Sequence, residues 1–554
     1  MTYVITQGCC NDASCVPACP VNCIHPTPDE PGYATAEMLY IDPDGCIDCG
    51  ACMDVCPVKA IEPDFDLADE FLPYQELNAQ YFRDPAHQGY ATTPVTTHVR
   101  PEWSGHGTLQ VAIVGSGPAA SYAAEELLGR RGLEVRVDMF ERLTTPWGLV
   151  RSGVAPDHQG TKAAADEFYR TARHERLRLF LDVEVGSTIS HEELSSRYHA
   201  VIYAVGAMSD RRLGIPGEDL PGSHSATEFV AWYNGHPDYA DRVFDLSGDR
   251  AVVIGNGNVA LDVARILLSD VEALRRTDIA DHALDQLAES RIREVVVVGR
   301  RGPAQASFTT PELLGLAAAV DLHVEPEELE IDEATRAWSQ GNDAAMALYK
   351  ARLVAELAVA TTGSPRARLR FLLSPTEILG DDRVEGVRLA RNTLVLKDGA
   401  VVARATEEAE VIPCDLLLRS VGYRGTAIPG LPFEEGRGVL PNVDGRVVQL
   451  GSLEPVVGVY AAGWVKRGPS GVIGTNKHCA RQSVDALLAD WQAGLLTVGT
   501  PERDVVELLP GHLDLAAWKT IDDHERAAGR AALRPRVKLV NRHRMLDVAA
   551  GRTG

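Results

Sequence analysis

The sequence predicts an α/β protein with two parallel-sheet domains, preceded by a small α+β module rich in cysteine. An apolar strand, a glycine-rich turn and a helix occupy residues 109–130, and the same pattern returns at residues 251–268. Another apolar strand follows each pattern, at 134–140 and at 294–298, and this alternation is typical of parallel sheets with right-handed crossovers. Nine of the eleven cysteines lie before residue 60, which sets that segment apart.

Two cysteine runs with equal spacing define the N-terminal module. The second run reads Cys46-x2-Cys49-x2-Cys52-x3-Cys56-Pro57, and the first reads Cys9-x2-Asp12-x2-Cys15-x3-Cys19-Pro20. In bacterial iron–sulfur ferredoxins, three thiolates of such a run hold one cluster and the fourth, before proline, reaches the other cluster. We therefore assign one [4Fe–4S] centre to Cys19, Cys46, Cys49 and Cys52, and a second centre to Cys9, Cys15 and Cys56.

Asp12 stands where a second ligand of the first run is expected. Because carboxylate is a poorer ligand than thiolate for iron–sulfur clusters, the second centre is either [3Fe–4S] or [4Fe–4S]. Cys10 and Cys23 are additional thiols; Cys10 is an alternative to Cys9 as a ligand, but Cys9 keeps the spacing regular. A zinc site or a disulfide scaffold is the alternative, and two full runs match zinc spacings poorly.

Composition narrows the classes of function. The net charge is −24, and residues 1–80 contain fourteen acidic residues and one basic residue, Lys59. This argues against nucleic acid or an anionic membrane as partner and favours a basic redox protein. We find no apolar run of transmembrane length and no signal-peptide pattern at the start, so we expect a cytoplasmic protein without membrane insertion.

The first glycine motif predicts a Rossmann-like dinucleotide site. Gly115 allows a tight turn after the strand, Gly117 lets the backbone approach a pyrophosphate, and Ala119 and Ala120 open a closely packed helix. Glu141 ends the following strand, where a carboxylate accepts from a ribose hydroxyl and repels a 2′-phosphate. The first site therefore favours FAD or NAD over NADP.

The second glycine motif predicts a different dinucleotide. Its residues are Gly255, Gly257, Asn258 and Val259. The next strand ends in Arg300 and Arg301 instead of an acid, and two guanidiniums suit a 2′-phosphate, so this site favours NADP. A helical insertion at about 274–291 explains the long spacing between the motif and the arginines.

A third segment belongs with the first site. A strand ends in the turn at Gly463, and Gly471, Val472 and Ile473 follow. Many FAD enzymes carry an aspartate after such a turn, but here the residue is Trp464. The alternative is that Trp464 only packs in the core.

Longer motifs show a family resemblance. They are Thr145–His158, Asn256–Asp262, Arg300–Pro303, Phe308–Leu313 and Gly463–Asn476. Residues 108–540 resemble adrenodoxin-reductase-type ferredoxin–NADP+ reductases, and the whole chain resembles the actinobacterial ferredoxin/ferredoxin–NADP+ reductase fusions.

The resemblance implies roles for particular residues. The implied FAD contacts are Gly115 through Ala120, Glu141, Leu149, Val185, Trp464, Gly471, Val472 and Ile473, and the implied NADP contacts are Asn258, Val259, Arg300, Arg301 and Glu312. Family members place an active-site histidine where His158 stands, and some pair it with a glutamate. The aligned position here is Gly315, which weakens the case for proton transfer by His158; a loop histidine held by its neighbours is the alternative.

The domain organisation follows from these motifs. We expect a ferredoxin domain at 1–62, a connector at 63–106, the FAD-binding domain at 107–206 and 441–554 (including a C-terminal segment), and the NADP-binding domain at 207–440, with its nucleotide fold from about 250. A flexible connector would require a basic face on the reductase to meet the acidic ferredoxin. One candidate face is Lys162, Arg170, Arg173, Arg176 and Arg178, and another is Arg265, Arg275, Arg276, Arg291 and Arg293.

These parts predict a ferredoxin–NADP+ oxidoreductase fused to its own ferredoxin. Hydride from NADPH would reduce FAD, and single electrons would pass to the clusters and on to an external acceptor, such as a monooxygenase or another ferredoxin-dependent enzyme. Alternatives are the electron-input module of a larger oxidoreductase and a redox-sensing module. A disulfide reductase would need a cysteine pair beside the flavin, and this region offers only Cys414 and Cys479.

Overall fold

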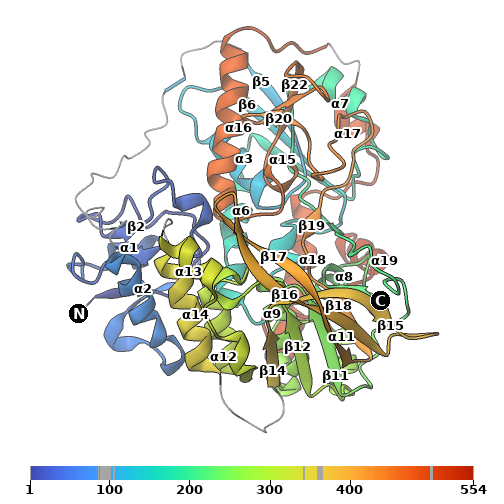
Figure 1. The fold of residues 1–554 in the computed structure, drawn as a ribbon. Coiled ribbons are helices and arrows are strands. Elements are labelled where there is room, and N and C mark those ends of the chain that lie inside the picture. Colours follow the sequence, from blue (N-terminus) through green and yellow to red (C-terminus); the bar gives the residue numbers. More distant parts are fainter. Residues whose placement is uncertain are drawn as a thin grey trace.

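The computed structural model describes residues 2–84, 87, 102–103, 107–340, 344–358, 366–499 and 503–552. It contains a ferredoxin module and two nucleotide domains, each built on its own mainly or wholly parallel sheet (Figure 1). No helix in these ranges is both long and apolar enough to cross a membrane.

The ferredoxin module is built from short elements. Strand β1 (Tyr3–Ile5) pairs antiparallel with β4 (Ile61–Pro63), and β2 (Ile24–His25) pairs with β3 (Tyr40–Ile41). The helices are α1 (Ala51–Val55), α2 (Pro73–Arg83), and the 3-10 turns η1 (Tyr33–Thr35), η2 (Asp64–Asp66) and η3 (Asp69–Phe71).

Helix α2 lies within the predicted connector, yet it is part of the ferredoxin module. The buried Asn78 side chain on α2 accepts from the backbone N of Ile41 at 2.9 Å and donates to the carbonyl of Ile5 at 2.9 Å. Tyr81 stacks on Tyr40 with ring centroids 4.4 Å apart. The first half of the predicted connector is therefore ordered by a polar anchor and an aromatic pair, and most of 85–106 lies outside the described residues.

The first nucleotide domain has a seven-stranded sheet in the order β20-β21-β22-β8-β5-β6-β7. Its strands are β5 (Leu109–Val114), β6 (Val135–Glu141), β7 (Leu177–Leu181), β8 (Ala200–Tyr203), β20 (Asn442–Val443), β21 (Arg446–Val448) and β22 (Pro455–Ala461). The helices are α3 (Pro118–Leu128), α4 (Leu149–Ser152), α5 (Gln159–Lys162), α6 (Ala164–Ala172), α7 (His191–Arg197), α15 (Trp464–Arg467), α16 (Thr475–Gln492), α17 (Val505–Leu508), α18 (Leu515–Ala531) and α19 (Arg542–Ala549).

The second nucleotide domain has a six-stranded parallel sheet in the order β10-β18-β11-β12-β14-β13. Its strands are β10 (Ser223–Ser225), β11 (Arg250–Ile254), β12 (Glu294–Val298), β13 (Asp321–Val324), β14 (Arg366–Arg370) and β18 (Leu416–Arg419). The helices are α8 (Ala226–Tyr233), α9 (Asn258–Leu268), α10 (Val271–Leu274), α11 (Asp281–Ala288), α12 (Thr310–Ala319), α13 (Glu333–Gln340), α14 (Ala345–Leu357), and the turns η6 (Pro303–Gln305) and η7 (Pro326–Glu328).

The predicted strand–turn–helix units are confirmed. β5 and β11 are the continuous apolar strands, and both are almost wholly buried because helices cover the sheets on both faces. Helices α3 and α9 begin where the glycine motifs predict, and α10 and α11 account for the expected helical insertion.

A three-stranded antiparallel sheet was not predicted. It consists of β15 (Leu373–Leu379), β16 (Gly386–Lys397) and β17 (Ala400–Pro413), and its long hairpin crosses in front of the second domain (Figure 1). A two-stranded pair, β9 (Ser209–Asp210) with β19 (Tyr423–Arg424), lies where the chain passes between the two domains.

The ferredoxin module packs against both nucleotide domains. Its core is continuous with that of the second domain, while Cys10, Val58 and Ala60 enter the core of the first domain. In Figure 1 the blue module lies beside α13 and α14, and α2 contacts α14. The Tyr74 hydroxyl donates to the carbonyl of Pro311 at 3.2 Å. The module is therefore docked on the reductase in this structure, whatever the length of the segment that joins them.

Candidate functional site

The thiols assigned to one [4Fe–4S] centre line a common cavity. Cys19, Cys46, Cys49 and Cys52 line one pocket in the ferredoxin module. This set includes Cys19 from the first run, as the crossing-over of the fourth cysteine predicts. Cys23 lines the same cavity, with its Sγ 3.4 Å from that of Cys19. A set of thiols that converges on one pocket fits the ligand set of an iron–sulfur cluster.

The thiols assigned to the second centre lie on the side of the module that faces the reductase. Burial raises the pKa of the Cys9 thiol to about 12, with Cys56 and Asp12 close enough to add to the shift. Cys9 packs against the core that holds Cys15 and also against the core of the first nucleotide domain, in which Cys10 is buried. Buried, mutually repelling thiols fit a metal cluster, because iron would stabilise their thiolates.

Asp12 is engaged by residues other than the cysteines. The Ser14 hydroxyl donates to its carboxylate, and Lys477 Nζ of helix α16 lies 3.6 Å from Asp12 Oδ2. The backbone N of Gly474, at the start of α16, donates to the carbonyl of Cys10 at 2.7 Å. A Cβ on Gly474 would meet Asp12 N at 2.2 Å, so the glycine permits this close approach.

The first glycine motif has the geometry of a pyrophosphate cradle. Gly115 has a φ of +102°, and a Cβ there would meet the carbonyl O of Ala204 at 2.5 Å. Gly117 faces open space, since a Cβ there would meet only Gly148 Cα, at 3.9 Å. Ala119 and Ala120 are buried in the first turns of α3. The open glycine edge at a helix N-terminus fits an FAD pyrophosphate.

Glu141 lies at the end of β6, beside the first motif. Its carboxylate accepts from Ser116 Oγ at 2.7 Å, from Ser116 N at 3.2 Å and from Leu143 N at 3.0 Å. Burial raises the pKa of this carboxyl. The site therefore presents a fixed, buried hydrogen-bond acceptor, which fits a ribose hydroxyl.

The third segment joins the first motif as predicted. Gly463 has a φ of +74°, and a Cβ there would meet the Cβ of Ala119 at 2.6 Å. Trp464 begins α15, donates its indole N–H to the carbonyl of Ser470 at 3.1 Å, and lies 5.4 Å from the Tyr423 ring. Gly471, Val472 and Ile473 lie just before α16. Of the other implied FAD contacts, Leu149 begins α4 and Val185 packs against the core that holds Phe180.

The second glycine motif repeats this geometry. Gly255 has a φ of +110°, and a Cβ there would meet the carbonyl O of Ser420 at 2.1 Å. A Cβ on Gly257 would meet nothing within 4 Å, so the start of α9 is open. Asn258 Oδ1 accepts from Thr309 N at 2.8 Å, which ties α9 to the segment before α12, and Val259 packs beside the core.

Arg300 and Arg301 follow β12, as the sequence predicts. Burial and the neighbouring Arg300 lower the pKa of Arg301. Among the described residues no carboxylate lies within salt-bridge distance of either guanidinium. Two adjacent cations without a counterion fit the 2′-phosphate of NADP.

His158 lies where the three parts of the protein meet. Its imidazole shares a small cluster with Asp262 of α9 and Glu312 of α12, their ligand atoms lying within 4.8 Å of one another. The guanidinium of Arg265 donates to His158 Nε2 at 3.0 Å, and the amide of Gln7 in the ferredoxin module lies 3.3 Å from the same nitrogen. One carboxylate oxygen of Glu312 is buried without a hydrogen-bond partner among the described residues.

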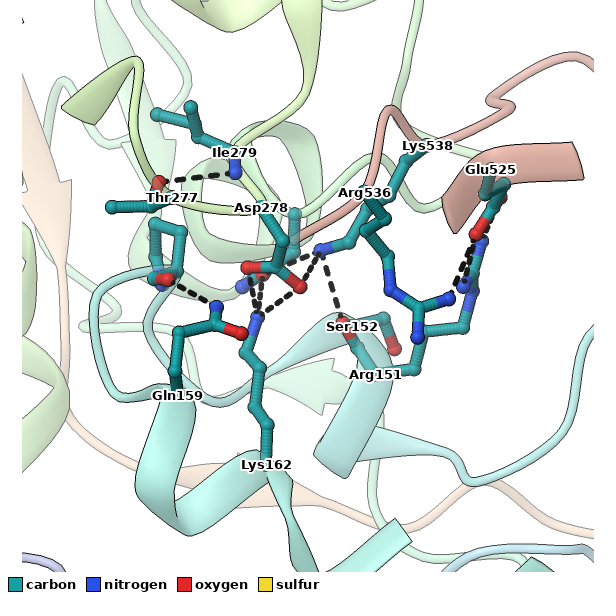
Figure 2. A network of polar contacts seen from close by, with 12 residues as sticks. Arg151, Ser152, Gln159, Lys162, Thr277, Asp278, Ile279, Glu525, Arg536 and Lys538 are labelled. Carbon is teal, nitrogen blue, oxygen red and sulfur yellow. Dashed lines mark hydrogen bonds and ion pairs between the residues drawn. The ribbon is translucent and has the colours of Figure 1, made fainter. Parts of the chain in front are cut away.

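A buried polar network fixes the two nucleotide domains to each other (Figure 2). Asp278 pairs with Lys162 Nζ at 2.6 Å and with Lys538 Nζ at 3.1 Å, so it links α5, the second domain and the C-terminal segment. Burial lowers the pKa of both lysines. Although burial opposes it, the two ammonium groups hold the pKa of Asp278 well below its usual range. Nearby, Arg151 pairs with the buried Glu525 at 2.6 Å.

Neither predicted basic face is the docking surface. Lys162 is buried in the network above, and Arg265 is buried against His158; Arg170 and Arg178 pair with acids of their own domain. Among the described residues, the cations that pair with acids of the ferredoxin module are instead Lys350, which pairs with Glu37, and Lys477, which pairs with Asp12. Lys350 Nζ lies 2.7 Å from Glu37 Oε1.

The thiols of the disulfide-reductase alternative are not paired. Cys414 packs in the core under the three-stranded sheet, and Cys479 on α16 accepts from Gly463 N at 3.2 Å in the core of the first domain. Two thiols in separate cores do not form a redox pair, so this alternative is wrong.

Comparisons with known proteins identify the family of the chain. Residues 39–62 match the 4Fe-4S binding domain family, and residues 109–301 match the pyridine nucleotide-disulphide oxidoreductase family. The chain is 49% identical over 560 residues to the probable ferredoxin/ferredoxin–NADP reductase of Mycobacterium bovis, covering 99% of this chain and 95% of that protein. The corresponding protein of Mycobacterium leprae is 48% identical over 568 residues, covering 100% of this chain and 98% of that protein.

A solved structure covers the reductase part. Mycobacterium tuberculosis FprA in complex with NADPH has a TM-score of 0.74 and 48% identity, covering 80% of this chain and 100% of that chain. The part without a counterpart in FprA corresponds in size to the ferredoxin module and its connection. The chain therefore belongs to the ferredoxin/ferredoxin–NADP reductase family, as a flavin-dependent ferredoxin–NADP+ oxidoreductase fused to its own ferredoxin.

Proposed function

We propose that electrons enter the ferredoxin module through the centre of Cys9, Cys15 and Cys56 and leave through the centre of the second run. A flavin accepts hydride from a nicotinamide and releases electrons singly, which matches a two-electron donor to one-electron clusters. The observation that carries the proposal is the contact between Gly474 and Cys10 at 2.7 Å. It joins the loop of the predicted FAD contacts Gly471 to Ile473 directly to the first cysteine run.

The residues of the two dinucleotide sites have separate tasks in this proposal. Gly115, Gly117 and Glu141 hold FAD by its pyrophosphate and ribose, and Trp464 covers the turn that faces it. Arg300 and Arg301 hold the 2′-phosphate and so select NADP(H) over NAD(H). The network around Asp278 keeps the two sites in a fixed relation, which hydride transfer requires because the reacting atoms must lie in contact.

The centre of Cys19, Cys46, Cys49 and Cys52, named here the second-run centre, faces solvent and is the proposed outlet for electrons. Cys49 is exposed, and Ile47, Met53 and Val55 around it are 58%, 40% and 43% exposed. Acidic side chains border these apolar groups, among them the exposed Asp44 and Asp54. We propose that an external acceptor, a monooxygenase or another ferredoxin-dependent enzyme, docks here through an apolar centre with a basic rim.

The centre of Cys9, Cys15 and Cys56, named here the first-run centre, is proposed to be [3Fe–4S]. The carboxylate of Asp12 is occupied by Ser14 and Lys477 and would have to leave both to serve as a ligand. Electron paramagnetic resonance of the oxidised protein tests this, since a three-iron centre gives a signal near g = 2.01 and a pair of oxidised four-iron centres gives none. The absence of that signal from protein with full iron content would contradict the assignment.

A paired substitution tests the direction of transfer. In Cys49→Ser the outlet centre is altered, so NADPH should still reduce the first-run centre within the first turnover while reduction of cytochrome c falls. In Cys15→Ser the first-run centre is altered, so reduction of that centre by NADPH and reduction of cytochrome c should both fail. Rapid freezing followed by electron paramagnetic resonance distinguishes the signals of the two centres. If the Cys49→Ser substitution by itself abolished reduction of the first-run centre, the proposed order of electron transfer would be refuted. Iron content and near-ultraviolet circular dichroism verify that each variant is folded.

We also infer a cytoplasmic location. All eleven cysteines are free thiols in the structure, which suits a reducing compartment. Fractionation of cells with an antibody to the chain tests this inference, and recovery outside the cytoplasm would contradict it.

A further inference from the structure

Gln7 of the ferredoxin module reaches into the reductase. It lies between β1 and the first cysteine run, and its side-chain Nε2 is 3.3 Å from Nε2 of His158. His158 begins helix α5 in the first nucleotide domain, and its backbone N donates to Ala155 at 3.0 Å. The contact therefore crosses from one functional module into the loop that carries the histidine of the other.

Gly315 provides the space for this contact. It lies in the interior of helix α12, and a Cβ there would meet Gln7 Nε2 at 2.3 Å and Gln7 Cδ at 3.0 Å. Glycine inside a helix is destabilising by roughly 0.5–1 kcal/mol relative to alanine. Here any larger residue would occupy the position of the Gln7 amide, so the glycine has a packing function.

The hydrogen bonds at His158 determine which nitrogen carries the proton. Arg265 Nη2 lies 3.0 Å from His158 Nε2, and a guanidinium can only donate. Nε2 must therefore present its lone pair, and the proton of the neutral ring is on Nδ1. The same requirement orients Gln7, whose amide N rather than O must face Nε2.

Arg265 is itself held in place. Its guanidinium pairs with Asp157, the neighbour of His158, and with Asp262 on its own helix. It is 5% exposed, so its position is fixed by burial as well as by charge. One donor on the imidazole thus comes from the second nucleotide domain and the other from the ferredoxin module.

We propose that Gln7 is a positioning residue for His158: the docked ferredoxin module supplies a second donor to Nε2, which orients the imidazole whose tautomer Arg265 fixes. Helix α12 brings the Glu312 carboxylate within 4.8 Å of the imidazole, but a carboxylate cannot donate to Nε2, and position 315, which faces Gln7, is glycine. The setting of His158 therefore depends on whether the ferredoxin module is docked. The ferredoxin module and His158 are coupled through one amide.

The ring vibrations of His158, which report the hydrogen bonds to Nε2, test the proposal without relying on turnover. Isotope-edited infrared spectroscopy of the holoprotein with labelled histidine, taken as a difference from His158→Gln, isolates this ring. We expect the Nδ1–H form in every variant, because Arg265 keeps its donor on Nε2. Gln7→Ala should shift the ring bands through the loss of one hydrogen bond to Nε2, and Gln7→Glu, which places an acceptor against the Nε2 lone pair, should shift them further. Identical spectra for wild type, Gln7→Ala and Gln7→Glu would overturn the proposal.

Two further variants separate positioning from general destabilisation. Gly315→Ala should displace the amide from the opposite side and reproduce the Gln7→Ala spectrum. Gln75→Ala is the matched control, because Gln75 is an exposed glutamine of the same module that donates to Asp64 instead. NADPH oxidation by ferricyanide should slow about fivefold in Gln7→Ala, the size of one hydrogen bond, and not in Gln75→Ala. An equal effect of both substitutions would contradict a specific role.

Discussion

Substitution of Glu37 by alanine is expected to undock the ferredoxin module. Glu37 makes two contacts with the second nucleotide domain, to Lys350 Nζ at 2.7 Å and to the backbone N of Thr310 at 2.6 Å. Thr310 begins α12, so the carboxylate also meets the positive end of a helix. No other acidic side chain of the module has two such partners among the described residues.

The magnitude follows from burial. Removing one partner of a buried ion pair costs about 3–5 kcal/mol. The Glu37 side chain is 22% exposed, and Lys350 keeps the carbonyls of Ala306 and Phe308 as acceptors, so the lower end applies. A loss of about 3 kcal/mol changes the docking equilibrium about 150-fold.

Two rates measured on the same protein give the assay. Anaerobic stopped-flow mixing with NADPH follows flavin bleaching directly and cluster reduction through its visible absorbance. In Glu37→Ala, flavin reduction should keep its rate and cluster reduction should slow by up to about 150-fold. The matched control is Glu76→Ala, which removes an exposed acid paired with Arg83 on α2. Unchanged cluster reduction in Glu37→Ala would refute the reasoning, because the docked contact would then not be the route of transfer.

Three further outcomes are expected from the described contacts. Asp278→Asn leaves Lys162 and Lys538 buried without a counterion and should lower the free energy of unfolding by about 3–5 kcal/mol, measured by urea denaturation. Arginines hold the pKa of Glu525 below its usual value, and ammonium groups do the same for Asp278. The stability that these two carboxylates contribute to the folded protein is therefore complete above about pH 4.5. It should be lost as the pH falls further, and a midpoint of thermal unfolding unchanged between pH 6 and about pH 3 would contradict this. Arg301→Ala should raise the KM for NADPH about 10- to 100-fold and leave that for NADH unchanged.

The sequence predicted the features that short sequence motifs determine. The cysteine spacing led to the set of Cys19, Cys46, Cys49 and Cys52, and the structure places all of them around one cavity. The two strand–glycine–helix units are local as well, because a strand period and a required positive φ are properties of a few neighbouring residues.

The contacts between modules could not be predicted in the same way. Lys350 lies 313 residues after Glu37, and Gln7 lies 151 residues before His158. A single lysine or glutamine has no recognisable sequence pattern. The clusters of basic residues do have one, but their members Lys162, Arg170, Arg178 and Arg265 pair with acids of the reductase itself. Gly315 was an available signal: it is a glycine inside a predicted helix, at the position where the family resemblance implies a glutamate in some members, and Gln7 occupies the space that a side chain there would need.

The distribution of charge should make only one of the two electron-transfer contacts sensitive to salt. The internal contact relies on a few buried groups, such as Lys350, which is 8% exposed, and a continuous apolar core. The proposed outlet instead has exposed acids, Asp44 and Asp54, whose attraction for a basic acceptor is screened within about 10 Å at 0.1 M salt. Raising the ionic strength should therefore slow reduction of cytochrome c while cluster reduction by NADPH keeps its rate. If both rates fell together, the internal step would depend on a transient encounter, and the docked arrangement would not be the working one.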